Sequence, residues 1–165
     1  METKNFKYPD TKAYEFVISE LKKRGVDLHE LSKIACHLQE QFIPQLTEEE
    51  CYQELNNVLH KRELLNNVMV GLELDRLAEE NQLKEPLLSI VRNDAGVFGV
   101  DESLALQIAD IYGTIGVTNF GYLDRVKYGI IKKFDEDKGH VNTFIDDLLG
   151  AIVAATCAKV AHKYA

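Results

Sequence analysis

The stretch "HVNTFIDDLLGAIVAATCAKVAHKY", residues 140–164, decides how we expect this chain to fold. From Leu148 to Ala158 almost every residue is apolar, and alanines are frequent. In a helix of this sequence, apolar side chains would lie all around the circumference. A helix that is apolar on all sides has to be surrounded by other elements. The stretch therefore predicts a central helix against which the rest of the chain packs.

The remaining sequence also predicts helices. Helical spacing of apolar residues runs through most of it, and the alternation typical of strands is missing. Thr47 and Glu50 form a capping-box pattern at the start of a long segment that we expect to break near residues 60–62. We expect a short helix from near Pro86 and another with Asp101 as its N-cap. The prediction is an all-α, single-domain helical bundle over residues 1–165, with the C-terminal helix at its centre.

Charge and composition limit the possible partners and location. The net charge is −8 and no stripe of Lys or Arg is present, so we expect no nucleic-acid partner and no lasting adhesion to an anionic membrane. No apolar run reaches the roughly 18 residues of a membrane span, and the opening residues lack the apolar core of a signal peptide. Cys36, Cys51 and Cys157 lie far apart and fit buried thiols in a reducing compartment. We therefore expect a cytoplasmic protein.

Paired acids precede two of the apolar helical stretches. Asp146 and Asp147 stand at the start of the expected central helix, where a buried carboxylate would bind a proton or a cation. Asp101 and Glu102 form a second pair, and Asp124 lies in the apolar stretch "GYLDRVK". If these carboxylates converge, they suit Mg²⁺. The alternative is a preference of acids for helix N-termini in a solvated first turn, and for Asp146 and Asp147 the spacing alone favours that alternative.

Two further polar features are open to more than one interpretation. Lys127 follows Asp124 by three residues on the same helix face, so it could bind phosphate or simply pair with Asp124. A polar line with a spacing of four residues runs along the expected middle helix. The favoured interpretation is that this line is the side of the helix that faces solvent. The alternative is that it lines a polar site in the interior. The line consists of Glu63, Asn67, Gly71 and Asp75.

Three stretches together resemble the phosphatidylglycerophosphatase A family. They are "VDESLALQI" (100–108), "YLDRVKYGIIKKFDED" (122–137) and "TFIDDLLGAIVAA" (143–155). The family pattern has an Asp-Glu pair, then Leu-Asp with Lys three residues later, then a Gly-containing loop and Ile-Asp-Asp before an Ala/Gly-rich helix. Here these elements are Asp101 and Glu102; Leu123, Asp124 and Lys127; Gly139; and Ile145, Asp146 and Asp147. The specific part covers about residues 98–160, and the whole chain resembles the soluble, all-helical bacterial branch that includes low-temperature-requirement proteins.

The resemblance implies a Mg²⁺-dependent phosphatase that hydrolyses phosphatidylglycerophosphate to phosphatidylglycerol through a metal-activated water. It implies that Asp101, Asp124, Asp146 and Asp147 act as metal ligands or their supports. Glu102 would be a ligand or a general base. Lys127 would hold the phosphate. We also expect a homo-oligomer that makes at most transient contact with a membrane.

Departures from the family pattern leave the substrate open. Membrane-bound members carry several spans and a Pro-Gly-Thr segment before the Asp-Glu pair, whereas Gly113-Thr114 follows the pair here. The family's Lys-Pro is Lys127-Tyr128 in this chain. Two alternatives therefore stand beside the lipid phosphatase. One is a phosphohydrolase that acts on a soluble phosphate ester, and the other is a non-enzymatic helical regulatory or interaction module with a structural cation.

Overall fold

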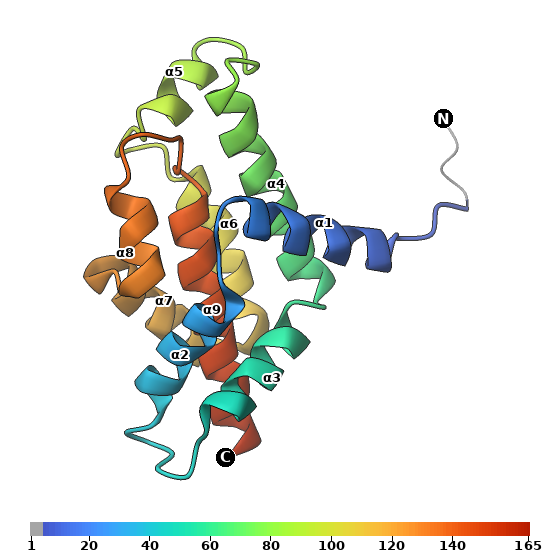
Figure 1. The fold of residues 1–165 in the computed structure, drawn as a ribbon. Coiled ribbons are helices and arrows are strands. Elements are labelled where there is room, and N and C mark those ends of the chain that lie inside the picture. Colours follow the sequence, from blue (N-terminus) through green and yellow to red (C-terminus); the bar gives the residue numbers. More distant parts are fainter. Residues whose placement is uncertain (1–4) are drawn as a thin grey trace.

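The computed structural model describes residues 5–165, and in this part of the chain helices joined by loops are present and strands are not (Figure 1). Residues 1–4, the start of the opening segment in which we expect no signal peptide, lie outside the described residues. The prediction of an all-α fold is confirmed. The elements are α1 (Asp10–Lys23), α2 (Leu28–Gln39), α3 (Glu48–Val58), α4 (Arg62–Glu79), α5 (Leu87–Arg92), α6 (Val100–Ala109), the 3-10 turn η1 (Asp110–Tyr112), α7 (Thr114–Val126), α8 (Gly129–Glu136) and α9 (Ile145–Lys163).

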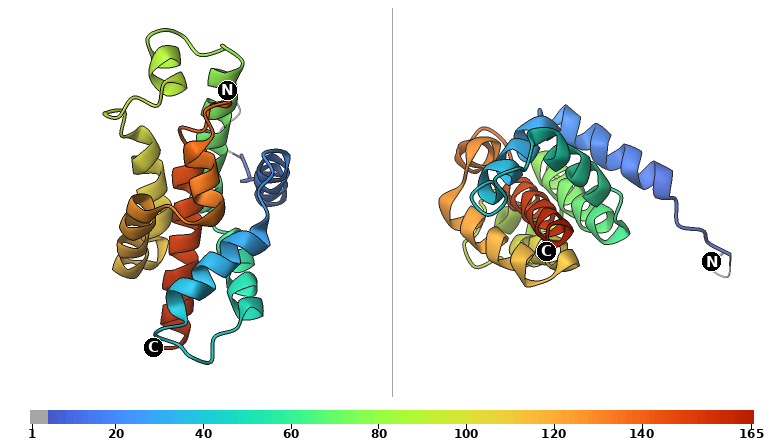
Figure 2. Two further views of the ribbon diagram at one scale, coloured as in Figure 1. Left: turned by 60° about the vertical axis from the view of Figure 1, so that its left-hand side comes forward. Right: turned by 90° about the horizontal axis from the view of Figure 1, so that it is seen from below.

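The C-terminal helix α9 occupies the centre, as its sequence predicts. It packs against α2, α3, α4, α6, α7 and α8, and the view along the molecule shows it enclosed by these helices (Figure 2). Every residue from Ile145 to Ala158 is buried. A fully buried Leu or Ile contributes about 1.5–3 kcal/mol, and the many alanines let the neighbouring helices approach closely. The core of the protein is therefore built around α9.

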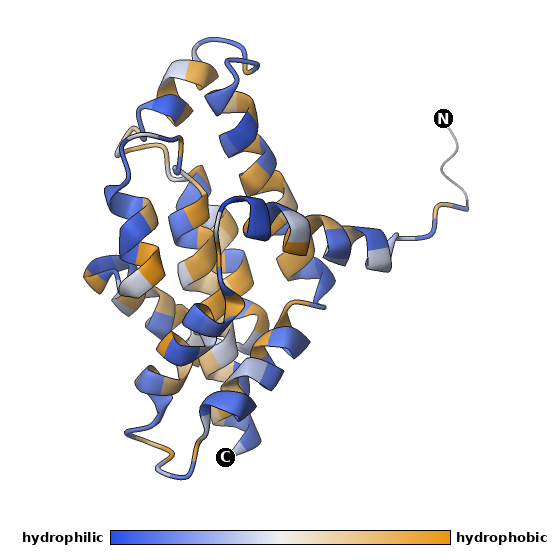
Figure 3. Cartoon of the chain, viewed as in Figure 1, coloured by the Kyte–Doolittle hydropathy of each residue, from blue (hydrophilic) through white to orange (hydrophobic). Residues whose placement is uncertain are grey.

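The other helices turn an apolar face to this core and a hydrophilic face outward (Figure 3). On α1, for example, Ala13, Val17 and Leu21 are buried at intervals of four residues. The expected break in the long middle segment falls between α3 and α4, and the Thr47–Glu50 capping box is present, with the Glu50 N–H donating to Thr47 Oγ1 at 3.2 Å. Local signals therefore placed these helix ends correctly.

The assignment of Asp101 as an N-cap is wrong. Helix α6 begins at Val100, and its N-cap is Gly99, which has a left-handed backbone with φ of +68°. Glycine adopts this conformation without a steric penalty, so the chain enters the helix before Asp101. Asp101 consequently lies inside the first turn, where its side chain is buried rather than capping the helix end.

The favoured interpretation of the polar line on α4 as a solvent face is also wrong for three of its four members. Asn67, Gly71 and Asp75 are buried, and only Glu63 is exposed. Gly71 allows α9 to pack closely, because a Cβ there would lie 2.7 Å from Leu148 Cδ1 and 3.1 Å from Phe144 Cβ. Polarity alone misled the prediction, since this face of α4 packs against the start of α9.

Cys36, Cys51 and Cys157 are buried free thiols, as expected. Among residues 5–165, no helix combines the length and apolarity that crossing a membrane requires.

Helix α7 approaches α6 and α9 through Gly116, which gives a test of the packing. A Cβ at Gly116 would press into the backbone carbonyl oxygen of Ala109, which cannot move aside as a flexible side chain would. We expect Gly116→Ala to lower the free energy of unfolding by about 3 kcal/mol. Gly121→Ala on the same helix meets nothing within 4 Å and should raise it by about 0.5–1 kcal/mol. Urea denaturation measures both, and equal stabilities of the two variants would contradict the close approach.

Candidate active site

Lys127 stands at the end of α7 in an unusual backbone conformation. Its φ is +54° and its ψ is +93°, and its N–H donates to the Leu123 carbonyl at 2.8 Å. Helices commonly end in a left-handed residue, but that residue is usually glycine, and other residues pay about 1–3 kcal/mol for such conformations. The strain is retained at a position whose long side chain is 18% exposed and lies among acids.

Four carboxylates from three helices surround the Lys127 ammonium. Lys127 Nζ lies 3.0 Å from Asp124 Oδ1 and 3.0 Å from Asp146 Oδ2. It also lies 3.5 Å from Asp147 Oδ1 and 3.7 Å from Asp135 Oδ1. Asp124 comes from α7, Asp135 from α8, and the Asp146–Asp147 pair from the first turn of α9. We call these five residues the Lys127 cluster.

The second acid pair divides between the interior and the surface. Asp101 is 9% exposed, and its pKa is raised by burial and by the charges of Asp94 and Asp124. Its charge in turn helps to raise the pKa of Asp147, so Asp101 belongs to the electrostatic surroundings of the Lys127 cluster. Glu102 is exposed. Of the pair, Asp101 therefore lies near the other predicted site residues and Glu102 points to solvent.

The interpretation of Asp146 and Asp147 as a solvated first turn is wrong. They are 8% and 6% exposed, because the start of α9 is enclosed by the rest of the bundle. Burial raises the pKa of Asp147 to about 8, and the neighbouring charge of Asp146 adds to the effect. Burial also raises the pKa of Asp146 to about 6, although the Lys127 ammonium acts in the opposite direction.

The pKa of Lys127 also reflects the carboxylates around it. Burial alone would lower the pKa of Lys127, but Asp146 and Asp124 outweigh it and hold that pKa above its ordinary value. Lys127 is therefore charged at neutral pH. A single ammonium faces four acids, and the pKa values of Asp146 and Asp147 stay raised in spite of it, so the Lys127 cluster is short of positive charge.

A polar cavity of about 290 Å³ opens beside this cluster. Two members of the Lys127 cluster, Asp135 and Asp146, also line this cavity. The basic side chains in its wall are Arg92, Lys138 and His140. The size lies at the small end of the range for ligand pockets. The wall also carries the acids Asp94 and Asp137, so a small anionic group that entered the cavity would meet charges of both signs.

The sequence prediction missed Asp135, Arg92 and Lys138. Asp135 does lie within the "YLDRVKYGIIKKFDED" stretch, eight residues after Lys127, and that spacing is the one signal that could have suggested it. Arg92 and Lys138 belong to distant segments that only the tertiary structure brings to one cavity.

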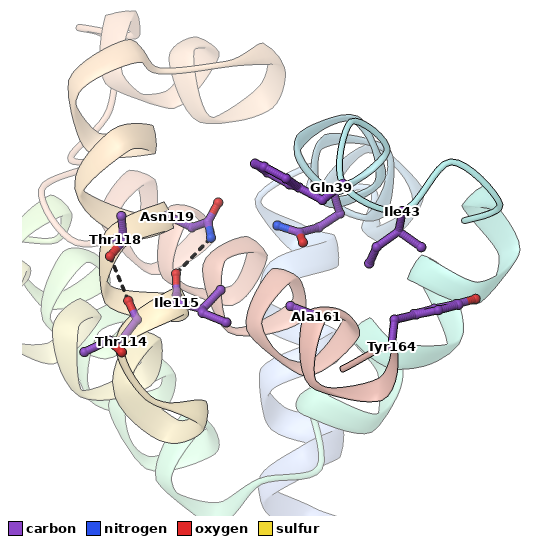
Figure 4. Close-up of a pocket in the computed structure, with 9 residues that line it drawn as sticks. Gln39, Ile43, Thr114, Ile115, Thr118, Asn119, Ala161 and Tyr164 are labelled. Carbon is purple, nitrogen blue, oxygen red and sulfur yellow. Dashed lines mark hydrogen bonds between the residues drawn. The ribbon is translucent and has the colours of Figure 1, made fainter.

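A larger cavity of about 450 Å³ is apolar and lies elsewhere (Figure 4). It is formed where α7, the end of α9 and the end of α2 with its following loop meet, and Thr114, Ile115, Thr118 and Asn119 supply its α7 side. Ile115 and Asp124 are nine residues apart, which places them on opposite sides of a helix. This apolar cavity is thus separated from the Lys127 cluster by the body of α7.

The donor atoms around Lys127 are carboxylate oxygens, the ligands that Mg²⁺ prefers. Within residues 5–165, however, no three His, Cys, Asp or Glu side chains are arranged to hold a metal ion. The ammonium of Lys127 lies between the carboxylates that would otherwise do so. The donor chemistry fits a hard cation, and a lysine holds the central position in this arrangement.

The fold and the cluster define an all-helical protein with a partly buried, carboxylate-rich site. A family model described as phosphatidylglycerophosphatase A matches residues 17–162, and the chain belongs to this family. The expected family resemblance is confirmed.

Relatives with solved structures share this fold over nearly their whole length. The crystal structure of the protein YpjQ from Bacillus subtilis has a TM-score of 0.89 and 41% identity, covering 95% of this chain and 98% of that one. The crystal structure of the low temperature requirement C protein from Listeria monocytogenes has a TM-score of 0.87 and 42% identity, covering 97% and 99%. The uncharacterized protein YutG from Bacillus subtilis is 44% identical over 144 residues, 87% of either chain.

The raised carboxyl pKa values predict how stability depends on pH. Folded Asp146 and Asp147 keep protons that the unfolded chain releases near pH 4, so the free energy of unfolding falls as pH rises from about 4 to about 8. Without divalent cations, we expect the melting temperature at pH 8 to be at least about 5 °C below that at pH 5, measured by scanning calorimetry. Asp147→Asn cannot titrate and should flatten the profile. A wild-type profile that rises over this range would contradict the assignment.

The position of Lys127 predicts a second effect on stability. Lys127→Met keeps most of the side-chain volume but leaves the carboxylates without their ammonium. We expect it to lower the free energy of unfolding by about 3 kcal/mol at pH 8 and by less at pH 5, where protons replace the missing charge. Lys132→Met is the control, because Lys132 is exposed and pairs with Glu136 on the surface, so its loss should change stability by about 0.5 kcal/mol or less. Equal losses for the two variants at pH 8 would contradict the role of Lys127 as the counter-charge.

Proposed function

We propose that this protein is a Mg²⁺-dependent phosphatase that hydrolyses a phosphate monoester, with phosphatidylglycerophosphate as the leading substrate and phosphatidylglycerol as its product. The observation that carries the proposal is the Lys127 cluster. Four carboxylates face one ammonium at 3.0–3.7 Å, and two of them border a polar cavity with basic side chains in its wall. Membership of the phosphatidylglycerophosphatase A family supports the reaction class.

The residues that would hold Mg²⁺ are Asp101, Asp124, Asp146 and Asp147, and we add Asp135 because it also faces Lys127. Bound there, Mg²⁺ would supply positive charge to the phosphoryl oxygens and lower the pKa of an attacking water. The raised pKa values of Asp146 and Asp147 support this proposal, because a divalent cation would favour the charged carboxylates that burial and, to a smaller extent, neighbouring acids now disfavour.

The protein's own cations complete the proposed site. Lys127 is a flexible point charge, so once the carboxylates have another cation it can turn to a phosphate oxygen. Arg92 and Lys138 line the cavity and would attract the anionic ester toward Asp146. Glu102 is exposed, so we propose a supporting role for it. It would attract the cation toward the Lys127 cluster or assist as a general base from outside the cluster.

The substrate class rests on the family and on the shape of the site. A cavity of about 290 Å³ accommodates a phosphate-bearing headgroup, while any acyl chains would stay outside it. A lipid would then be reached through transient membrane contact on the side of the molecule where the polar cavity opens. A soluble phosphate ester that presents the same headgroup is the alternative substrate. A homo-oligomer stays a prediction that light scattering coupled to size-exclusion chromatography tests.

Phosphate release from short-chain phosphatidylglycerophosphate, with and without Mg²⁺, tests the proposed function. We expect Mg²⁺-dependent release by the wild type and at least a hundredfold lower kcat for Asp146→Asn, which loses a charge within the Lys127 cluster. Asp110→Asn is the matched control, because Asp110 is exposed at the opposite end of α6 from Asp101 and should keep full activity.

The other outcomes separate the alternatives. Activity on a panel of soluble phosphate esters without activity on the lipid would move the proposal to a soluble substrate. No hydrolysis of any ester at saturating Mg²⁺, by protein that Mg²⁺ stabilises against heat, would favour the non-enzymatic module with a structural cation. Full activity of Asp146→Asn would show that the site is elsewhere.

A further inference from the structure

The buried polar face of α4 plays no part in the function proposed above. Its most unusual member is Asp75, a carboxylate that is 0% exposed and whose pKa is raised by burial to about 8. The backbone N–H groups it accepts from act against that rise, and the charge of Asp146 adds to it. Burying such a group costs free energy unless its hydrogen bonds compensate, so its contacts need an explanation.

Asp75 caps the start of α9 from another helix. The Phe144 N–H donates to both carboxylate oxygens of Asp75, at 3.1 and 3.2 Å, and the Ile145 N–H donates to Oδ2 at 3.0 Å. The local N-cap residue of α9 is Phe144, which provides no side-chain cap. The first N–H groups of a helix lack partners within the helix, and here a residue about seventy positions away satisfies two of them.

Helix α4 holds the same segment at three successive turns. Gly71 leaves room for Phe144 and Leu148, Asp75 binds the N–H groups of residues 144 and 145, and Glu79 accepts the Val141 N–H at 2.6 Å. These three residues are spaced by four along α4 and therefore lie on one face. The loop before α9 and the first residues of α9 are thus fixed against one rigid helix.

The position of this cap bears directly on the Lys127 cluster. Asp146 and Asp147 immediately follow the two N–H groups that Asp75 binds. Acids at a helix start commonly serve as caps themselves. Because Asp75 already provides the cap, the carboxylates of Asp146 and Asp147 are free to face Lys127 at 3.0 and 3.5 Å.

We propose that Asp75 is a positioning residue for the proposed cation site. By capping α9 from α4 it fixes the orientation of the first turn and aims Asp146 and Asp147 at the place where the cation binds. This inference rests on the proposed function only in that the Lys127 cluster binds a divalent cation. It does not depend on which phosphate ester is the substrate.

The test compares Asp75→Asn with two controls in the full-length protein, using Mn²⁺ as the probe. Asparagine has nearly the same shape as aspartate, but it has no charge and only one acceptor oxygen. Its NH₂ group would therefore face one of the backbone N–H groups at the start of α9, where two donors cannot form a hydrogen bond. We expect the Mn²⁺ affinity, measured by electron paramagnetic resonance, to fall at least tenfold and kcat to fall at least tenfold, while KM changes less than threefold. Glu79→Gln is the matched change of acid to amide on the same face of α4; its amide oxygen can still accept the Val141 N–H, so it should change Mn²⁺ affinity less than threefold.

The second control separates positioning from simple stability. Val68→Ala removes buried volume from α4 and should lower the melting temperature while leaving Mn²⁺ affinity unchanged. If Asp75→Asn does not fold, Asp75→Ser, which removes the carboxylate without placing an amide donor against the two N–H groups, gives the same comparison. Thermal melts confirm that each variant is folded at the assay temperature.

The outcomes distinguish this inference from the proposed function. An Asp75→Asn protein that melts lower but keeps Mn²⁺ affinity and kcat within twofold of the wild type would overturn the positioning role and leave the phosphatase proposal standing. A wild type that binds Mn²⁺ and hydrolyses no ester, with weaker Mn²⁺ binding in Asp75→Asn, would support the positioning role and reject the phosphatase. A wild type that binds no Mn²⁺ would overturn both.

Discussion

One ammonium among four carboxylates is the interaction on which this structure depends. Lys127 reaches Asp124 on its own helix, Asp135 on α8, and Asp146 and Asp147 on α9. Without a cation in this place, the ends of three helices would meet with negative charges facing one another, two of them on the buried side chains of Asp146 and Asp147. The left-handed backbone at Lys127 is the local strain that places the ammonium there.

The core and the candidate site share one helix, which links stability to chemistry. Helix α9 provides the buried centre of the bundle, and its first turn carries the paired acids. Anything that shifts the start of α9 therefore moves Asp146 and Asp147 together, and the close approach of α4 at Gly71 restricts such shifts. Interiors packed to this density transmit small displacements rather than absorbing them, so the precision of the acid pair is a property of the whole bundle.

The acids of the cluster can be neutralised in three ways: by protons, by Lys127 or by an added cation. Burial raises the pKa of Asp147 to about 8 and that of Asp146 to about 6, which brings the exchange between protons and cations into the neutral range. Cation binding at such a site releases protons and strengthens as pH rises. The polar cavity beside the cluster is lined by basic and acidic side chains, whereas the side chains that line the apolar cavity on the other side of α7 are uncharged.

The sequence by itself determined the helical class, the central place of α9 and most helix boundaries. These follow from local signals: apolar residues around the whole of residues 148–158, the Thr47–Glu50 capping box, and the break between α3 and α4. The family pattern also singled out charged residues that lie near one another. This part of the prediction needed only local geometry, because Asp124 and Lys127 are one helical turn apart and Asp146 and Asp147 are adjacent.

Only the tertiary structure decided which polar residues are buried and what they face. The line of Asn67, Gly71 and Asp75 has the spacing of a surface stripe, and it is buried because α9 happens to begin against it. Arg92 and Lys138 come to the site through the packing of α5 and the loop after α8, which no local pattern encodes. Helix formation depends on neighbours within a few residues, so sequence periodicity reveals it. The meeting of charges from distant segments depends on how whole helices pack, and that information is spread over the entire core.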